Sequence, residues 1–326
     1  MALLCGSIAG MGCDVGPRET LDPRGARVRL LATYPKDGAG LSCTPDSPAD
    51  CGVPLDAPIE LRFDRFLLPS TVVRQSLRAS TADSEVFLQP RYDAVERVVV
   101  LRVVNGGIWL PGTRYIVRLK LPDDDPNGWG FRAFDGAPLA KDGRAPIEFT
   151  FRTRRDYTPQ HPPAPTADWN DMQTVIERGG CTASGCHGSS VSSMGLDLRS
   201  AASVEDTAVN EVAHQAESEP NAMEPREDAV RFGTQMPLVD PGRPGNSYLF
   251  YKLLVNPESY TGACESQHSV ALDGCVAFPK EQTDELRAWF VRGRPMPLPT
   301  GDEPGHLSLD DIRTVQSWIA ADAPLK

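Results

Sequence analysis

Two thiols and an imidazole stand close together in the second half of the chain, at Cys181, Cys186 and His187. A Cys-x-x-Cys-His segment is the usual attachment motif for c-type haem, in which both thiols bond to the porphyrin and the histidine binds the iron. Four residues separate the cysteines here, where the common motif has two. On these residues alone, a disulfide between Cys181 and Cys186 beside an incidental His187 is an alternative.

Two further chemistries fit these side chains less well. A zinc site needs more ligands, and the sequence contains no second cysteine pair of standard zinc spacing. A Cys–His nucleophile is disfavoured, because residues adjacent in sequence rarely place the base on the thiol.

Helices are expected on both sides of this segment. Apolar residues recur at helical spacing from Trp169 to Ile176, and two glycines follow. A C-terminal helix is expected within 307–324, with Ser308 as its N-cap. Another helix is expected over 284–295.

Four segments of the second half occur in the order typical of one family, the planctomycete-type cytochrome c proteins. They are Ser193–Arg199 (SMGLDLR), Val239–Lys252 (VDPGRPGNSYLFYK), Met296-Pro297 and Leu307–Pro324. The resemblance implies a mainly α-helical cytochrome c-like domain with one covalent haem c. It implies that Cys181 and Cys186 attach the haem and that His187 binds the iron.

The resemblance also implies a methionine as the sixth iron ligand, and we assign it to Met296. This residue lies between two prolines just before the C-terminal helix. Met236, which also precedes a proline, is the rival, whereas Met194 is too close to His187 in sequence. A second histidine ligand, His268, is a weaker alternative.

The first half of the chain carries β-strand patterns. Apolar and polar residues alternate over 59–63, 115–119 and 147–151, and 98–103 is a β-branched run. Glycine-rich and proline-rich turns separate these segments, which together predict a β-sandwich. The acidic cluster Asp123–Asp125 is interpreted as a solvated turn, with a calcium site as the alternative.

This half resembles the bacterial Ig-like domain of surface-layer and secreted proteins. The matching segments are Phe63-Asp64, Pro69–Val72, Leu110–Tyr115 and Phe149–Thr153. The resemblance implies a tyrosine corner, in which Tyr115 bonds back to the backbone. No catalytic constellation is present in this half of the sequence, so a spacer or docking role is expected.

The expected fold is therefore multidomain, an N-terminal Ig-like β-sandwich followed by a C-terminal cytochrome c-like domain. A change in charge supports the division, with 21 Lys and Arg against 19 Asp and Glu up to Arg155 and 12 against 25 beyond it. His161, in the proline-rich linker, is expected to be solvated. The expected ranges are a leader at 1–23, the sandwich at 24–155, the linker at 156–167 and the haem domain at 168–326.

The eight cysteines fall in four pairs close in sequence, which favours an oxidising compartment. We expect disulfides Cys43–Cys51 and Cys264–Cys275. The N-terminal segment resembles the end of a bacterial lipoprotein signal, which implies lipidation at Cys13. The predicted location is the periplasm, the outer membrane or the cell surface, with any membrane contact made through this anchor.

The sequence predicts an exported protein that binds one haem for electron transfer to an unidentified redox protein. An enzyme is not expected, because a histidine and a methionine would fill both axial positions of the iron. Nucleic acid is excluded as the main partner by the net charge of −11. The alternative function is a structural or adhesive cell-surface protein whose cytochrome-like domain has lost haem or keeps it for stability.

Overall fold

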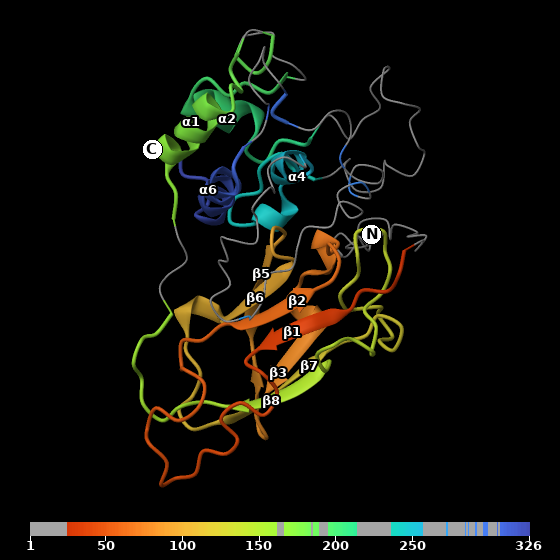
Figure 1. Ribbon diagram of the computed structural model, residues 1–326, viewed down its shortest axis with the longest axis vertical. Coiled ribbons are helices and arrows are strands. Elements are labelled where there is room, and N and C mark those ends of the chain that lie inside the picture. The colour runs from red at the N-terminus through yellow and green to blue at the C-terminus, as the bar shows by residue number, and fades with distance from the viewer. Residues whose placement is uncertain are drawn as a thin grey trace, which may run out of the picture.

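The structure is a computed structural model, and two sheets and several helices make up the part of the chain that it describes (Figure 1). The described residues are 25–161, 166–183, 185–188, 195–213, 236–256, 272, 284, 286, 291, 296–298, 305 and 307–326.

Eight strands form two four-stranded antiparallel sheets, drawn in the lower part of Figure 1. The first sheet has the order β1-β2-β6-β5 and the second the order β4-β3-β7-β8. The strands are β1 (Leu30–Tyr34), β2 (Ile59–Phe63), β3 (Leu77–Ser80), β4 (Glu85–Val86), β5 (Leu88–Asp93), β6 (Val98–Val103), β7 (Arg114–Leu119) and β8 (Glu148–Arg152). The prediction of a β-sheet domain is confirmed, whereas its assignment as Ig-like stays a prediction.

The sequence patterns locate four of these strands correctly, within one residue. The β-branched run 98–103 forms β6, which pairs with β2 on one side and with β5 on the other. Strand β2 departs from the expectation of one core face and one solvated face. All five of its residues are buried, including Glu60 and Arg62.

The predicted tyrosine corner is present before β7. The hydroxyl of Tyr115 accepts a hydrogen bond from the backbone N–H of Leu110 at 2.9 Å. Its ring stacks on Phe151, and Trp109 packs edge-on against both rings. This aromatic group joins the loop before β7 to the core between the sheets.

The described helices lie beyond one end of the sheets (Figure 1). Two helices predicted from the sequence, one from its periodicity and one from its capping residues, are confirmed as α1 and α6. Each begins with a capping box, at Asp168 in α1 and at Ser308 in α6. In the 284–295 segment only 284, 286 and 291 are described, and the first two are helical. The helices are α1 (Trp169–Arg178), α2 (Ala201–Thr207), α4 (Tyr248–Leu254) and α6 (Leu309–Ala320), with a 3-10 turn η7 (Pro244–Asn246) before α4.

The start of the proline-rich segment packs on the sheets. The Asp56 carboxylate accepts hydrogen bonds from the backbone N–H groups of Gln160 and His161, at 2.8 and 3.0 Å. The prediction that His161 is solvated is wrong, because its imidazole is 19% exposed and lies 3.3 Å from Asp56. Burial raises the pKa of Asp56, but these hydrogen bonds outweigh burial and hold the pKa below its usual range.

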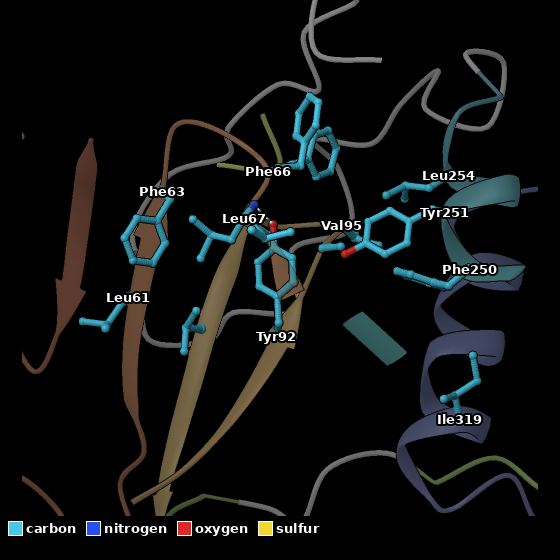
Figure 2. Close-up of a cluster of buried hydrophobic side chains, with 14 of the residues drawn as sticks. Leu61, Phe63, Phe66, Leu67, Tyr92, Val95, Phe250, Tyr251, Leu254 and Ile319 are labelled. Carbon is cyan, nitrogen blue, oxygen red and sulfur yellow. Dashed lines mark hydrogen bonds between the residues drawn. The ribbon is translucent and has the colours of Figure 1, made fainter. Parts of the chain in front are cut away.

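The sheets and the helices share one hydrophobic core. Tyr92, at the end of β5, and Val95 face Phe250 and Tyr251 of α4 across this contact, which we call the seam (Figure 2). A Cβ atom on Gly245 of η7 would lie 2.8 Å from Cβ of Tyr92, so only glycine allows this approach. The hydroxyl of Tyr251 donates to the Gly245 carbonyl at 2.8 Å.

A network of charged side chains lies beside the apolar part of the seam. Arg313 of α6 reaches Asp93 and Glu96, at 3.4 and 2.7 Å. Glu96 also accepts a hydrogen bond from Arg62 of β2, at 3.0 Å. These side chains are 4–20% exposed, and burial raises the pKa of Asp93 against the opposing charge of Arg313. Because buried charges are costly unless they are paired, the network favours a single docking geometry.

We predict that Arg313→Met lowers the free energy of unfolding by about 3 kcal/mol, because it leaves two buried carboxylates without this partner. Urea unfolding at neutral pH measures the change. Arg118→Met removes one member of the exposed Arg118–Glu148 pair and serves as the control, with little expected loss. Equal stability of the two variants would contradict the role given to the buried network.

Candidate functional site

The Cys181–Gly188 segment forms a closed turn at the end of α1. The backbone N–H of Cys181 donates to the Ile176 carbonyl at 3.0 Å, which continues the hydrogen bonding of the helix. The N–H of His187 donates to the Cys181 carbonyl, also at 3.0 Å, and closes the turn. The cysteines therefore stay on one compact turn despite the longer spacing between them.

Gly188 is required where this turn crosses itself. A Cβ atom at this position would lie 2.0 Å from the carbonyl oxygen of Thr182, well inside contact distance. Any larger residue would push the chain that follows His187 away from the turn.

A hydrogen bond orients the imidazole of His187. Its Nδ1 lies 3.1 Å from the carbonyl oxygen of Leu196, and the N–H of Leu198 donates to the carbonyl of His187 at 2.9 Å. Because a carbonyl oxygen only accepts, the proton is on Nδ1 and the lone pair is on Nε2. A backbone carbonyl that accepts from Nδ1 is typical of histidines that bind a metal through Nε2.

An ion pair holds the segment that carries the Leu196 carbonyl. The guanidinium of Arg199 contacts both carboxylate oxygens of Asp197, at 2.6–3.1 Å. The backbone N–H of Asp197 donates to Thr207 Oγ1 of α2 at 3.0 Å. Hydrogen bonds from Arg199 lower the pKa of Asp197 to about 2.

The two thiols, His187 and Met296 all line one apolar cleft, with an empty volume of about 940 Å³ that includes its open mouth. The lining residues come from the end of α1, the turn, the 196–198 segment, α4 and the 296–298 segment. They are Gly179, Gly180, Cys181, Gly185, Cys186, His187, Leu196, Leu198, Leu238, Tyr248, Leu249, Lys252, Leu253, Met296, Pro297 and Leu298.

The structure separates the two described methionine candidates. Met296 lines the cleft, and its backbone N–H donates to the Lys252 carbonyl of α4 at 3.3 Å. Met236 is buried but is not a lining residue. Met194 and His268 lie outside the described residues.

The two thiols are not bonded to each other. Burial, with a smaller contribution from the neighbouring Cys186, raises the pKa of Cys181 to about 11, so the Cys181 thiol is protonated at neutral pH. A protonated thiol is a poor nucleophile, which disfavours a Cys–His dyad. Across the described part of the chain, His, Cys, Asp and Glu nowhere form a group of three that could hold a metal ion.

Of the remaining predicted positions, those that the structure describes are not among the residues that line the cleft. A disulfide joins Cys43 to Cys51. Cys13, Cys264 and Cys275 lie outside the described residues. The acidic cluster Asp123–Asp125 is neutralised by cations, because its carboxylates pair in turn with Arg27, Lys141 and Lys120.

Sequence reasoning did not single out Lys252 as a site residue. The sequence signal for this residue is a lysine inside the otherwise apolar segment Tyr248–Leu254 (YLFYKLL).

Among the described helices, none is long and apolar enough to span a bilayer.

Comparisons with known proteins give partial likenesses. No family model and no curated protein matches the chain. The N-terminal part of the bacterial S-layer protein SbsC is 9% identical over 44% of this chain and 27% of its own, with a TM-score of 0.26. LD transpeptidase LdtMt1 in complex with imipenem is 17% identical over 39% of each chain, with a TM-score of 0.24. The chain thus spans less than half the length of these structures.

We predict that Asp197→Asn destabilises the fold at neutral pH and that the difference from the unaltered protein disappears in acid. The pKa of Asp197 is about 2 in the folded state and about 3.9 when unfolded, so its contribution is present above pH 4 and is lost as the pH falls toward 2. Thermal unfolding between pH 2 and pH 7 measures this. Asp206→Asn, at an exposed position on α2, is the control. A difference that stays constant with pH would contradict the ion-pair assignment.

Proposed function

We propose that this protein is an exported c-type cytochrome-like protein, which binds one covalent haem for electron transfer. The observation that carries the proposal is the convergence of Cys181, Cys186, His187 and Met296 on one apolar cleft. These residues come from segments more than 100 positions apart, and their chemical types are those that c-type haem requires.

The donor set supports this cofactor more than it supports other groups. Two thiols that are not joined as a disulfide are available for thioether bonds. His187 presents its lone pair on Nε2, because Nδ1 donates to Leu196. A thioether at Met296 suits iron in a haem, whereas zinc sites favour thiolate and imidazole ligands.

When bound, haem would supply reversible one-electron exchange at its iron. The chain would attach it through Cys181 and Cys186, and His187 and Met296 would bind its iron. The leucines of the cleft would exclude water, which favours electron transfer over chemistry at an open iron site. An electron carrier is therefore favoured over an enzyme.

Export is part of the proposal. The Cys43–Cys51 disulfide is of a kind that persists in oxidising compartments, where c-type haem proteins are also matured. Lipidation at Cys13 would attach the protein to a membrane surface, and one acyl chain alone would hold it only weakly.

We expect protein made with a cytochrome c maturation system to gain the mass of one haem and a Soret band that persists after acid–acetone extraction. Cys181→Ala combined with Cys186→Ala is expected to lose the adduct completely, since no thiol remains in the turn. Intact-protein mass spectrometry measures the adduct, and Cys43→Ala with Cys51→Ala is the control that should keep it.

An unmodified mass for the unaltered protein would favour the alternative, a structural cell-surface protein with a degenerate cytochrome-like part. An adduct that survives loss of both Cys181 and Cys186 would contradict the assigned attachment site.

We predict that Met296→Ala lowers the reduction potential and removes the weak charge-transfer band of thioether-ligated oxidised haem, because the sixth ligand is lost. Met236→Ala, a buried methionine outside the cleft, is the matched control and should retain both properties. Redox titration and the near-infrared spectrum of the oxidised protein measure the two effects. The opposite pattern would move the ligand to Met236.

A further inference from the structure

The inference concerns a chain of hydrogen bonds that runs from His187 to helix α2. The carbonyl oxygen of Leu196 lies 3.1 Å from His187 Nδ1 and accepts its proton. The same peptide unit carries the N–H of Asp197, which donates to Thr207 Oγ1 at 3.0 Å. The Thr207 hydroxyl donates in turn to the Ser203 carbonyl at 2.7 Å. A single peptide unit therefore links the imidazole to the hydroxyl.

All the donors in this chain point in the same direction. The peptide bond between Leu196 and Asp197 is trans, so its carbonyl and its N–H point away from each other. The carbonyl faces His187, and the N–H faces Thr207. Hydrogen bonds arranged in this way polarise one another, and each bond strengthens the next. The Thr207 hydroxyl thus makes the Leu196 carbonyl a stronger acceptor for the imidazole.

Other contacts hold the peptide unit in place without Thr207. The N–H of Leu198 donates to the His187 carbonyl at 2.9 Å, and the Arg199 guanidinium contacts the carboxylate of Asp197. Loss of the hydroxyl would therefore weaken the polarisation of the peptide while these contacts remain. Because a threonine side chain carries no charge, its replacement by another neutral residue leaves the net charge near the imidazole unchanged.

We infer that Thr207 is a positioning residue that sets the basicity of His187 as an iron ligand, an assignment that rests on the proposed function. A stronger hydrogen bond at Nδ1 gives the imidazole more negative charge and makes Nε2 a better electron donor. A better donor stabilises oxidised iron more than reduced iron. The hydroxyl of Thr207 therefore lowers the reduction potential of the bound haem.

The competing assignment is that Thr207 serves only the structure of α2. Its bond to the carbonyl four residues before it is common in helices, and Thr174 of α1 makes the same bond to Asn170 at 2.9 Å. Thr174 is exposed and lies outside the chain of bonds that leads to His187. Thr174→Val therefore loses the same kind of helix bond and is the matched control.

The test uses two variants without the hydroxyl, Thr207→Val and Thr207→Ala, and one that keeps it, Thr207→Ser. Each protein is matured with haem, and its mass and its reduction potential at neutral pH are measured. Proton NMR of the reduced protein gives the chemical shift of the His187 Nδ1 proton. A proton in a weaker hydrogen bond is more shielded, so this shift reports the bond to Leu196 directly.

We expect Thr207→Val and Thr207→Ala to keep the haem adduct but to have a higher reduction potential. The Nδ1 proton of His187 should move upfield in both variants, because the Leu196 carbonyl accepts less strongly. Thr207→Ser should retain the potential and the proton shift of the unaltered protein, and Thr174→Val should change neither.

Several results would overturn the inference. An unaltered potential or an unaltered proton shift in both hydroxyl-free variants would show that the hydroxyl does not act on the imidazole. Loss of the adduct in both, equal changes in Thr174→Val, or failure of Thr207→Ser to retain the two properties would leave Thr207 a structural role only. An unaltered protein without the haem adduct would overturn the proposed function as well, and its mass distinguishes that case from the others.

Discussion

The docking of the helices on the sheets depends on the seam, where the end of β5 and the 3-10 turn η7 approach without room for a methyl group. Gly245 lies against Tyr92, and the paired charges around Arg313 leave few other ways to dock the helices on the sheets. The sequence predicts two domains joined by a linker. In the structure, residues of both halves belong to one core, so the sheets support the helices that build the cleft.

Helix α4 connects the seam to the cleft, because it contributes residues to both. One side of α4 meets Tyr92 and Val95 at the seam through Phe250 and Tyr251, and Leu249, Lys252 and Leu253 line the cleft. A helix that is apolar on both sides has to be covered on both sides. The sheets cover one side, and the other side forms part of the wall of the cleft.

Local signals made about half of the fold predictable. Strand β6 has a β-branched run, and α1 and α6 have helical periodicity and capping residues. Strand β5 contains Pro90, and α4 has apolar residues on all sides. Neither segment therefore shows a clear alternation of apolar and polar residues from which its structure could be predicted. The cysteine–histidine turn was predictable because its residues are adjacent. The burial of Lys252 and the docking of His161 arise only from tertiary packing.

The closed turn bears on how such sites are recognised. The hydrogen bond from the His187 N–H to the Cys181 carbonyl brings the ends of the motif together although four residues separate the cysteines. Sequence searches written for two intervening residues therefore pass over a turn of this kind, although its two thiols and its imidazole line one cleft.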